Sequence, residues 1–261
     1  MPDSLAADAM TLLRQRIAAI EQIGPKLEAG GAAFVRSGHG GLDGVLGGFA
    51  RSCVHEIFGE AATGFTLALA ARLTRHHFVW IAQNFAHLEQ GEPYAPGLAA
   101  FGLKPEQMLL ITCEDTLGVL HAAEEALKAR VFDCVILEPW GTAKALDLTA
   151  SRRLMLAAAQ GQSTALMLRS GAHEAPSAAA ARWHIRAAPS VSPFAVGSGS
   201  AGFPGFPRFD VELTRARNGR LGRWLMEWNN HERTFETPLS GAAFSSPADR
   251  PVAAAAPRKL G

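Results

Sequence analysis

Residues 59–66 have the sequence Gly59-Glu60-Ala61-Ala62-Thr63-Gly64-Phe65-Thr66, which is the most informative motif in the chain. It follows a strand-like apolar run that ends at Phe58 and precedes a segment with apolar residues at helical spacing. The phosphate-binding loop of nucleotide hydrolases has the pattern G-x-x-x-x-G-K-[ST] between a strand and a helix. Every position fits except one, because Phe65 stands where the pattern has lysine. Since that lysine neutralises the β- and γ-phosphates, the sequence indicates an NTPase frame without the cation that the chemistry needs.

The surrounding chain alternates short apolar strands with helices. We expect strands over residues 53–58, 78–82, 108–112, 132–137 and 164–168, and helices over residues 64–76, 117–130 and 148–160. Strands that are apolar throughout and alternate with helices indicate a mainly parallel sheet buried on both faces. The fold class is therefore α/β, a P-loop-type core flanked by helices.

The C-terminal part has a different pattern. Residues 209–214 alternate apolar and polar side chains, and Asn218-Gly219 is a strong hairpin signal. The strand expected after it, residues 223–228, places Trp224, Met226 and Trp228 on one face. We therefore expect an antiparallel C-terminal hairpin extension of the parallel core, after a glycine- and proline-rich loop over residues 190–207.

Three segments are expected along the chain. Residues 1–30 include an amphipathic helix, residues 31–240 form the core with its degenerate P-loop, and residues 241–261 form a flexible tail rich in alanine and proline. The 261 residues are 48% hydrophobic, which is enough for a sizeable core.

Charge and cysteine content narrow the class of protein. The formal net charge of +1 gives no overall field that would attract nucleic acid. The cysteines Cys53, Cys113 and Cys134 have no paired spacing, so we expect buried free thiols in a reducing compartment and no metal site. No apolar run has the length of a membrane span, and charged residues interrupt the N-terminal region where a signal peptide would lie. We expect a soluble, cytoplasmic protein.

The order of these parts resembles the RecA family, and the later motifs resemble the ImuA family within it. The RecA-like parts are the lead-in Ser37-Gly38-His39-Gly40-Gly41-Leu42-Asp43 and the strand, loop and helix around residues 59–66. The ImuA-like parts are residues 146–154, 164–166, 176–183, 212–220 and 224–228. The resemblance implies a RecA-like accessory protein of SOS-induced mutagenic translesion DNA synthesis. It implies as partners ImuB, an inactive polymerase homologue, and possibly RecA and an error-prone C-family polymerase, with DNA contacted indirectly or weakly.

Other positions of the RecA active site are also altered. The catalytic glutamate of the family falls at Asn84, and an amide cannot act as a general base. The strand that carries the family's acidic Mg²⁺-contacting residue ends in Glu138 where an aspartate is usual, and the later nucleotide-sensing strand end, 167–170, has no glutamine. We therefore expect no catalytic residues, no cofactor and no ATP hydrolysis, with Phe65 and Asn84 as the decisive replacements.

Two features keep alternatives open. The degenerate loop (Gly59, Gly64, Phe65, Thr66) could retain an anion site, since N–H groups at a helix start attract phosphate. Thr66 could hold Mg²⁺, but without the lysine we favour capping or packing at the start of the helix. A basic cluster on the expected hairpin could contact nucleic acid or a partner, although a solvated hairpin is the favoured interpretation; it consists of Arg208, Arg215, Arg217, Arg220 and Arg223.

Two other functions compete with the accessory role. One is a weak or partner-activated DNA-dependent ATPase, with a cation supplied by a partner or by Arg169 in the same chain. The other is a cell-division inhibitor of the SulA type, which would bind FtsZ. The sequence leaves the oligomeric state, the partner surfaces and nucleotide binding without hydrolysis undecided.

Overall fold

The computed structural model describes residues 10–17, 33–190 and 205–238. The strands are β1 Phe34–Val35, β2 Phe49–Ala50, β3 Val54–Phe58, β4 His77–Gln83, β5 Met108–Cys113, β6 Phe132–Glu138, β7 Thr164–Leu168, β8 Ala181–Ala187, β9 Arg208–Ala216, β10 Gly222–Asn229 and β11 Thr234–Glu236. The helices are α2 Gly40–Leu46, α3 Ala62–Leu73, α4 Asn84–Gln90, α5 Ala95–Ala100, α6 Thr116–Lys128 and α7 Leu148–Gly161.

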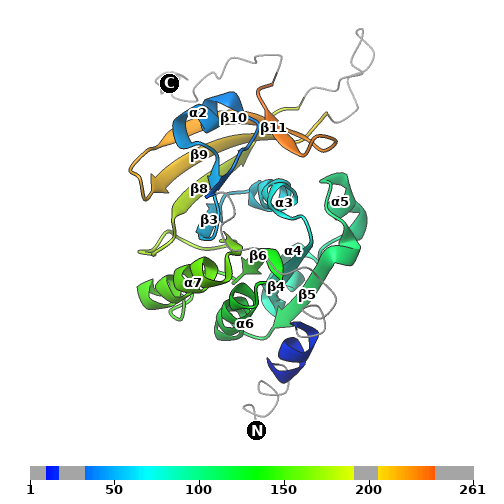
Figure 1. Cartoon of the computed structure of the whole chain (residues 1–261), viewed down its shortest axis with the longest axis vertical. Helices are drawn as coiled ribbons and strands as arrows, with labels where there is room; N and C mark the ends of the chain where they lie inside the picture. Colours follow the sequence, from blue (N-terminus) through cyan, green and yellow to red (C-terminus); the bar gives the residue numbers. More distant parts are fainter. Residues whose placement is uncertain (1–9, 18–32, 191–204, 239–261) are drawn as a thin grey trace, which may run out of the picture.

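A nine-stranded sheet forms the centre of the molecule (Figure 1). Its strand order is β11-β10-β9-β8-β3-β7-β6-β4-β5. The strands from β3 to β5 in this order are parallel, β8 joins β3 in parallel, and β9, β10 and β11 follow as antiparallel neighbours. The expected α/β class, with a mainly parallel sheet and an antiparallel C-terminal hairpin, is confirmed.

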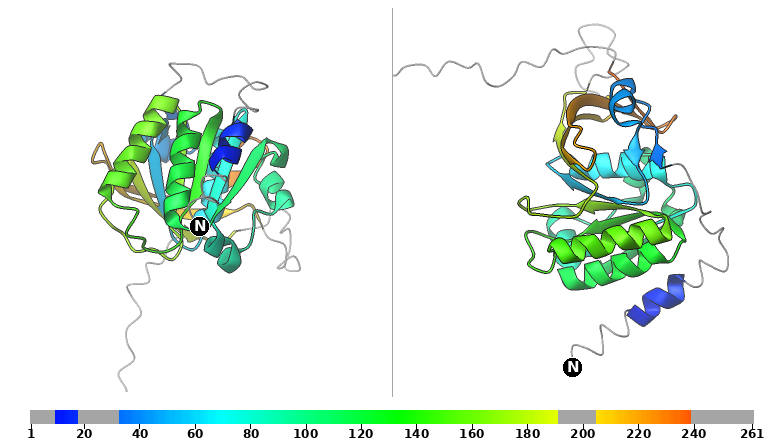
Figure 2. Two further views of the ribbon diagram at one scale, coloured as in Figure 1. Left: turned by 90° about the horizontal axis from the view of Figure 1, so that it is seen from below. Right: turned by 60° about the vertical axis from the view of Figure 1, so that its left-hand side comes forward.

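The sheet is buried on both faces because its strands alternate their side chains between two cores. In β6, Cys134 and Ile136 pack with α3, while Val135 and Leu137 pack with α6 and α7. Figure 2 shows α6 and α7 lying side by side on one face of the sheet, with α3 on the other. Strands β8–β11 curve over α3, so this helix is enclosed by the sheet on more than one side (Figure 1).

The helix starts on the α6–α7 side carry side-chain caps. Asp115 accepts a hydrogen bond from the backbone N–H of Gly118 at 2.8 Å, and Asp147 accepts one from Ala150 at 2.7 Å. A side-chain oxygen at this position satisfies an N–H group that has no partner within the helix. These caps fix where α6 and α7 begin.

The N-terminal segment is described in part. Residues 10–17 are helical, and Leu13 and Ile17 are buried against the α6–α7 side of the core. Arg14 Nε lies 3.2 Å from Glu125 Oε2 of α6. The rest of the expected N-terminal segment, most of the loop at 190–207 and the expected tail 241–261 lie outside the described residues. Among the described residues, no helix has the length and apolar character that crossing a bilayer requires.

The last described strand contacts the lead-in to the core. The backbone N–H of Phe235 in β11 donates to the carbonyl of Ser37 at 2.8 Å. Asp43 in α2 holds Ser37 in turn, because the backbone N–H of Ser37 donates to Asp43 Oδ1 at 2.8 Å. The beginning and the end of the core therefore meet beside the strand–loop–helix unit.

Candidate functional site

The helix after β3 begins earlier than the motif predicts, which shortens the loop between β3 and α3. Helix α3 begins at Ala62 with Ala61 at its N-cap, so only residues 59–61 separate strand and helix. The N–H of Phe65 already donates to Ala61 O at 3.1 Å. A phosphate loop needs its N–H groups to converge on the ligand. Here helical hydrogen bonding extends back into the segment that would have to wrap around the phosphates.

Packing against strand β8 explains why the first residue of the motif is a glycine. Gly59 has φ +107, and a Cβ atom placed on it would lie 2.0 Å from the carbonyl oxygen of Ile185 in β8. The same strand holds the rest of the loop, because Ala61 N donates to Ile185 O at 3.4 Å and Glu60 Oε1 accepts from Ala187 N at 3.1 Å. The loop is thus fastened to β8, and Glu60 adds a carboxylate that would repel a phosphate.

Phe65, at the lysine position, is fully buried at the centre of an aromatic cluster. Its ring centroid lies 6.0 Å from that of Phe49, 6.3 Å from Trp183, 5.9 Å from Phe209 and 5.4 Å from Phe235. Edge-to-face and tilted pairs at this range stabilise a core beyond the area they bury. We call Phe49, Phe65, Trp183, Phe209 and Phe235 the aromatic cluster.

Gly64 and Thr66 also belong to this packing. A Cβ on Gly64 would lie 3.3 Å from the ring of Phe209. Thr66 is fully buried inside α3, and among the described residues its Oγ1 has no hydrogen-bond partner. Because Ala61 occupies the cap, the expected capping role for Thr66 is wrong, while the expected packing role agrees with its burial. The short loop, the buried Phe65 and Glu60 do not fit the phosphates of a nucleotide bound in the P-loop manner.

Glu138 is the last residue of β6 and lies at the same edge of the sheet as the 59–66 loop, because β3, β7 and β6 are parallel. It is 4% exposed and accepts a hydrogen bond from Trp80 Nε1 at 3.1 Å, and burial raises its pKa. Asn84 follows β4 as the first residue of α4 and is exposed. The cavity beside Glu138 has a volume of about 150 Å³ and is also lined by Thr63 and Trp80. This volume is below the range usual for ligand pockets.

Arg169, the alternative cation in the same chain, lies in the core. It is 5% exposed, its guanidinium carbon lies 5.6 Å from the ring centroid of Phe58, and burial lowers its pKa. Its Nη1 contacts Met167 Sδ at 3.8 Å. These contacts place it against β3 and β7.

The five arginines of the expected basic cluster are not gathered into one patch. Arg208 and Arg223 form ion pairs with Glu227 and Asp210 on the paired strands β9 and β10. The hydrogen bond from Arg223, together with that from Arg186, holds the pKa of Asp210 below its usual value. These two arginines are therefore neutralised by the hairpin itself.

The other three arginines point to separate surroundings. Arg215 donates to Ser177 Oγ at 3.3 Å, and Arg220 donates to the carbonyl oxygen of Val45. Arg217 lines a pocket near the start of β3. Trp228 is fully buried and Trp224 partly so.

Two curated relatives match most of the chain. "Protein ImuA" of Caulobacter vibrioides strain NA1000 / CB15N and of strain ATCC 19089 / CIP 103742 / CB 15 are each 30% identical over 222 residues, covering 78% of this chain and 82% of the relative. The chain belongs to the ImuA family. A scan against protein-family models finds no match.

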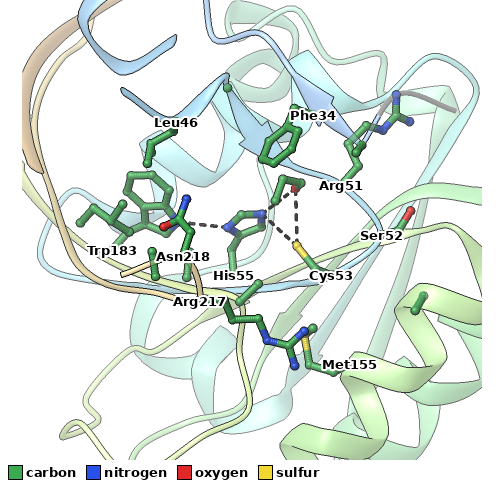
Figure 3. A pocket seen from close by; sticks show the side chains of 18 of the residues that line it. Phe34, Leu46, Arg51, Ser52, Cys53, His55, Met155, Trp183, Arg217 and Asn218 are labelled. Atoms are coloured by element: carbon green, nitrogen blue, oxygen red, sulfur yellow. Dashed lines mark hydrogen bonds between the residues drawn. The ribbon is translucent and has the colours of Figure 1, made fainter. Parts of the chain in front are cut away.

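The ImuA fold seen here has a second concave site, which the sequence patterns did not predict. It lies at the opposite end of β3 from the 59–66 loop, with a volume of about 470 Å³. Figure 3 shows Cys53, His55 and Trp183 at its base. The sequence held one local signal for this site. Residues 53 and 55 are two apart at the start of a strand, so their side chains are expected on the same face of the sheet.

Cys53 and His55 lie close together but do not form an activated thiol pair. Trp183 Nε1 donates to His55 Nδ1 at 3.1 Å, which places the ring proton on Nε2, 2.8 Å from the carbonyl of Ala50. Burial lowers the pKa of His55 and raises the pKa of Cys53 to about 12. A nucleophilic cysteine needs the opposite shift, so these contacts hold β2, β3 and β8 together.

Proposed function

We propose that this member of the ImuA family is a non-hydrolysing accessory protein of SOS-induced, mutagenic translesion DNA synthesis. It acts by protein contacts, with ImuB as its main partner and RecA and the error-prone C-family polymerase as further ones. Membership of the ImuA family supports the mutagenesis context. The protein contacts DNA indirectly or weakly and works in the cytoplasm, where replication takes place.

The observation that carries the non-catalytic part is the position of Phe65. The side chain that would neutralise phosphate is replaced by a ring at the centre of the aromatic cluster, fully buried. The core therefore uses this position for stability, and Asn84 offers no base nearby. No cofactor and no metal are part of the proposal.

We assign different roles to the three segments of the chain. The core over residues 31–240 serves as the scaffold, and the N-terminal segment 1–30 and the tail 241–261 are candidate contact regions. The helical residues 10–17 bury Leu13 and Ile17 against the core, so a partner would meet the outer side of this helix, which includes the exposed Leu12.

The test measures binding and turnover on the same full-length protein. We expect co-purification with ImuB and no release of phosphate from ATP above background, alone or with ImuB and single-stranded DNA. Thr66→Ala is the diagnostic variant, because an ATPase would use this hydroxyl on Mg²⁺ whereas the accessory protein does not need it. Phosphate release that Thr66→Ala abolishes would overturn the proposal in favour of the ATPase, and binding of FtsZ in place of ImuB would favour the division inhibitor.

A further inference from the structure

The pocket at the start of β3 has an apolar wall. Leu46 is the last residue of α2, Met155 and Leu156 come from α7, and Leu213 comes from β9. At about 470 Å³ the pocket is large enough for one or two side chains of another molecule. These residues come from three elements that are far apart in the sequence, and Figure 3 shows Leu46 and Met155 on different sides of the pocket.

Two large apolar side chains of the pocket are unusually open to solvent. Phe34 is 46% exposed and Leu156 is 58% exposed. Single exposed apolar residues are ordinary on protein surfaces. Two that line one hollow, together with its apolar wall, have the character of an anchor pocket in a protein interface.

The charged side chains described around the pocket are all arginines. Among the residues that the structure describes, Arg51, Arg152 and Arg217 line it and no Asp or Glu does. Within the described residues, none of these three guanidinium groups has an ion-pair or side-chain hydrogen-bond partner. By contrast, Arg153, the next residue of α7, is paired with Glu124. Three cations without a partner in the described part of the chain, placed around an apolar hollow, are complementary to an anionic, apolar ligand.

We propose that this pocket docks a peptide segment of a partner protein in which an apolar side chain is flanked by carboxylates. The apolar side chain contacts Met155 and Leu156, and the carboxylates pair with the three arginines. This gives the partner-binding function proposed above a surface, and so it rests on that function.

A peptide fits this pocket better than single-stranded DNA. Sequence-tolerant binding of single strands relies on exposed aromatic rings on which bases stack. Trp183 is 1% exposed and its indole N–H is engaged by His55, so it offers no such face. Phe34 is the one exposed aromatic ring among the described lining residues, and a single ring makes no platform for successive bases. The rest of the wall is aliphatic, which suits a leucine, isoleucine or phenylalanine side chain.

The experiment is selection of a random dodecamer peptide display library on the full-length chain, followed by affinity measurement of the enriched peptides. We expect enriched peptides with an apolar residue beside Asp or Glu, and a loss of affinity of about tenfold or more in Arg152→Glu/Arg217→Glu. Leu156→Ser should weaken the same peptides. All three residues are exposed, so these variants retain the fold. Arg153→Glu is the matched control, with the same charge change one residue along α7, and should bind as the wild type.

Results of three kinds would overturn the proposal. One is the absence of an acidic–apolar consensus, or enriched peptides that bind the double variant as tightly as the wild type. A second is binding of a thirty-nucleotide oligo(dT) that the double variant loses, which would assign the pocket to nucleic acid. A third is a dimer in sedimentation that the double variant dissociates, which would assign it to a second copy of the chain. The selection contains neither ImuB nor ATP, so it can fail while ImuB binding without ATP turnover is still observed.

Discussion

The carbonyl oxygen of Ile185 occupies the space that a side chain on Gly59 would need, since a Cβ there would lie 2.0 Å away. Gly59 is the first glycine of the phosphate-loop motif, yet the close neighbour is strand β8 of the same chain. The close approach of β8, rather than a phosphate, therefore accounts for the glycine at this position.

Gly59→Ala should therefore destabilise the fold, by about 3 kcal/mol, because the new Cβ collides with backbone and the positive φ is strained. Gly64→Ala is the matched substitution at the second motif glycine. Its Cβ meets a ring atom of Phe209 at 3.3 Å, and the helix propensity gained offsets that contact, so a change below about 1 kcal/mol is expected. Urea unfolding measures both, and equal effects of the two variants would contradict the packing role of Gly59.

Restoring the motif lysine should damage the protein. Phe65→Lys places a charge among four aromatic rings and should cost at least about 4 kcal/mol. Phe65→Leu, which stays apolar but loses the ring contacts, should cost about 2 kcal/mol. The order of urea midpoints is thus wild type, Phe65→Leu, Phe65→Lys. A Phe65→Lys protein as stable as the wild type, or one that hydrolyses ATP, would show that the position still faces a phosphate site.

Glu138 predicts a pH-dependent difference in stability. Burial raises its pKa in the folded protein, so the folded state binds this proton more tightly than the unfolded state. Ionised Glu138 therefore costs stability at neutral pH, and the wild type recovers that stability as the pH falls through the raised pKa. Glu138→Gln keeps an acceptor for Trp80 and removes the charge. Its free energy of unfolding should exceed that of the wild type at neutral pH, and the difference should close as the pH falls through the raised pKa of Glu138 towards the ordinary pKa of a glutamate. Urea titrations at each pH measure this difference, and a difference that widens on acidification would refute the assignment.

The ion pair between Arg182 and Glu56 lies in the core, at 2.8 Å between Nη2 and Oε2, with both side chains less than a tenth exposed. Arg182→Met leaves Glu56 buried without its partner and should cost about 3–5 kcal/mol. Glu56→Leu/Arg182→Met removes both charges and should be more stable than Arg182→Met alone. A double-mutant cycle measures the coupling, and strictly additive effects would mean that Glu56 does not depend on Arg182.

The parallel core and its hairpin were predictable because their signals are local. Continuous apolar runs gave β4, β5, β6 and β7, and Asn218-Gly219 correctly placed the turn between β9 and β10. In the glycine-rich lead-in, α2 was missed because it has no apolar periodicity. It is held by side-chain bonds such as His39 Nδ1 accepting from Leu42 N at 3.2 Å.

The state of the candidate site depended on partners distant in sequence. The loop is closed by Ile185 in β8, which no pattern around residue 59 could indicate. The arginine spacing on the hairpin suggested a basic cluster, whereas the pairing of β9 with β10 brings Asp210 to Arg223 and Glu227 to Arg208. Register, rather than composition, decides which of these charges remain available.

The backbone hydrogen bond between Phe235 and Ser37 joins the end of the core to its beginning. The core can therefore be completed only after the ribosome has synthesised β11. Phe235 packs against Phe49 and Phe65, with ring centroids 5.8 Å and 5.4 Å away. Until translation has passed β11, a nascent chain holds those two rings without their covering partner. Premature termination between β10 and β11 would therefore release a polypeptide whose apolar core is exposed to solvent. Such a polypeptide is a substrate for chaperones and proteases.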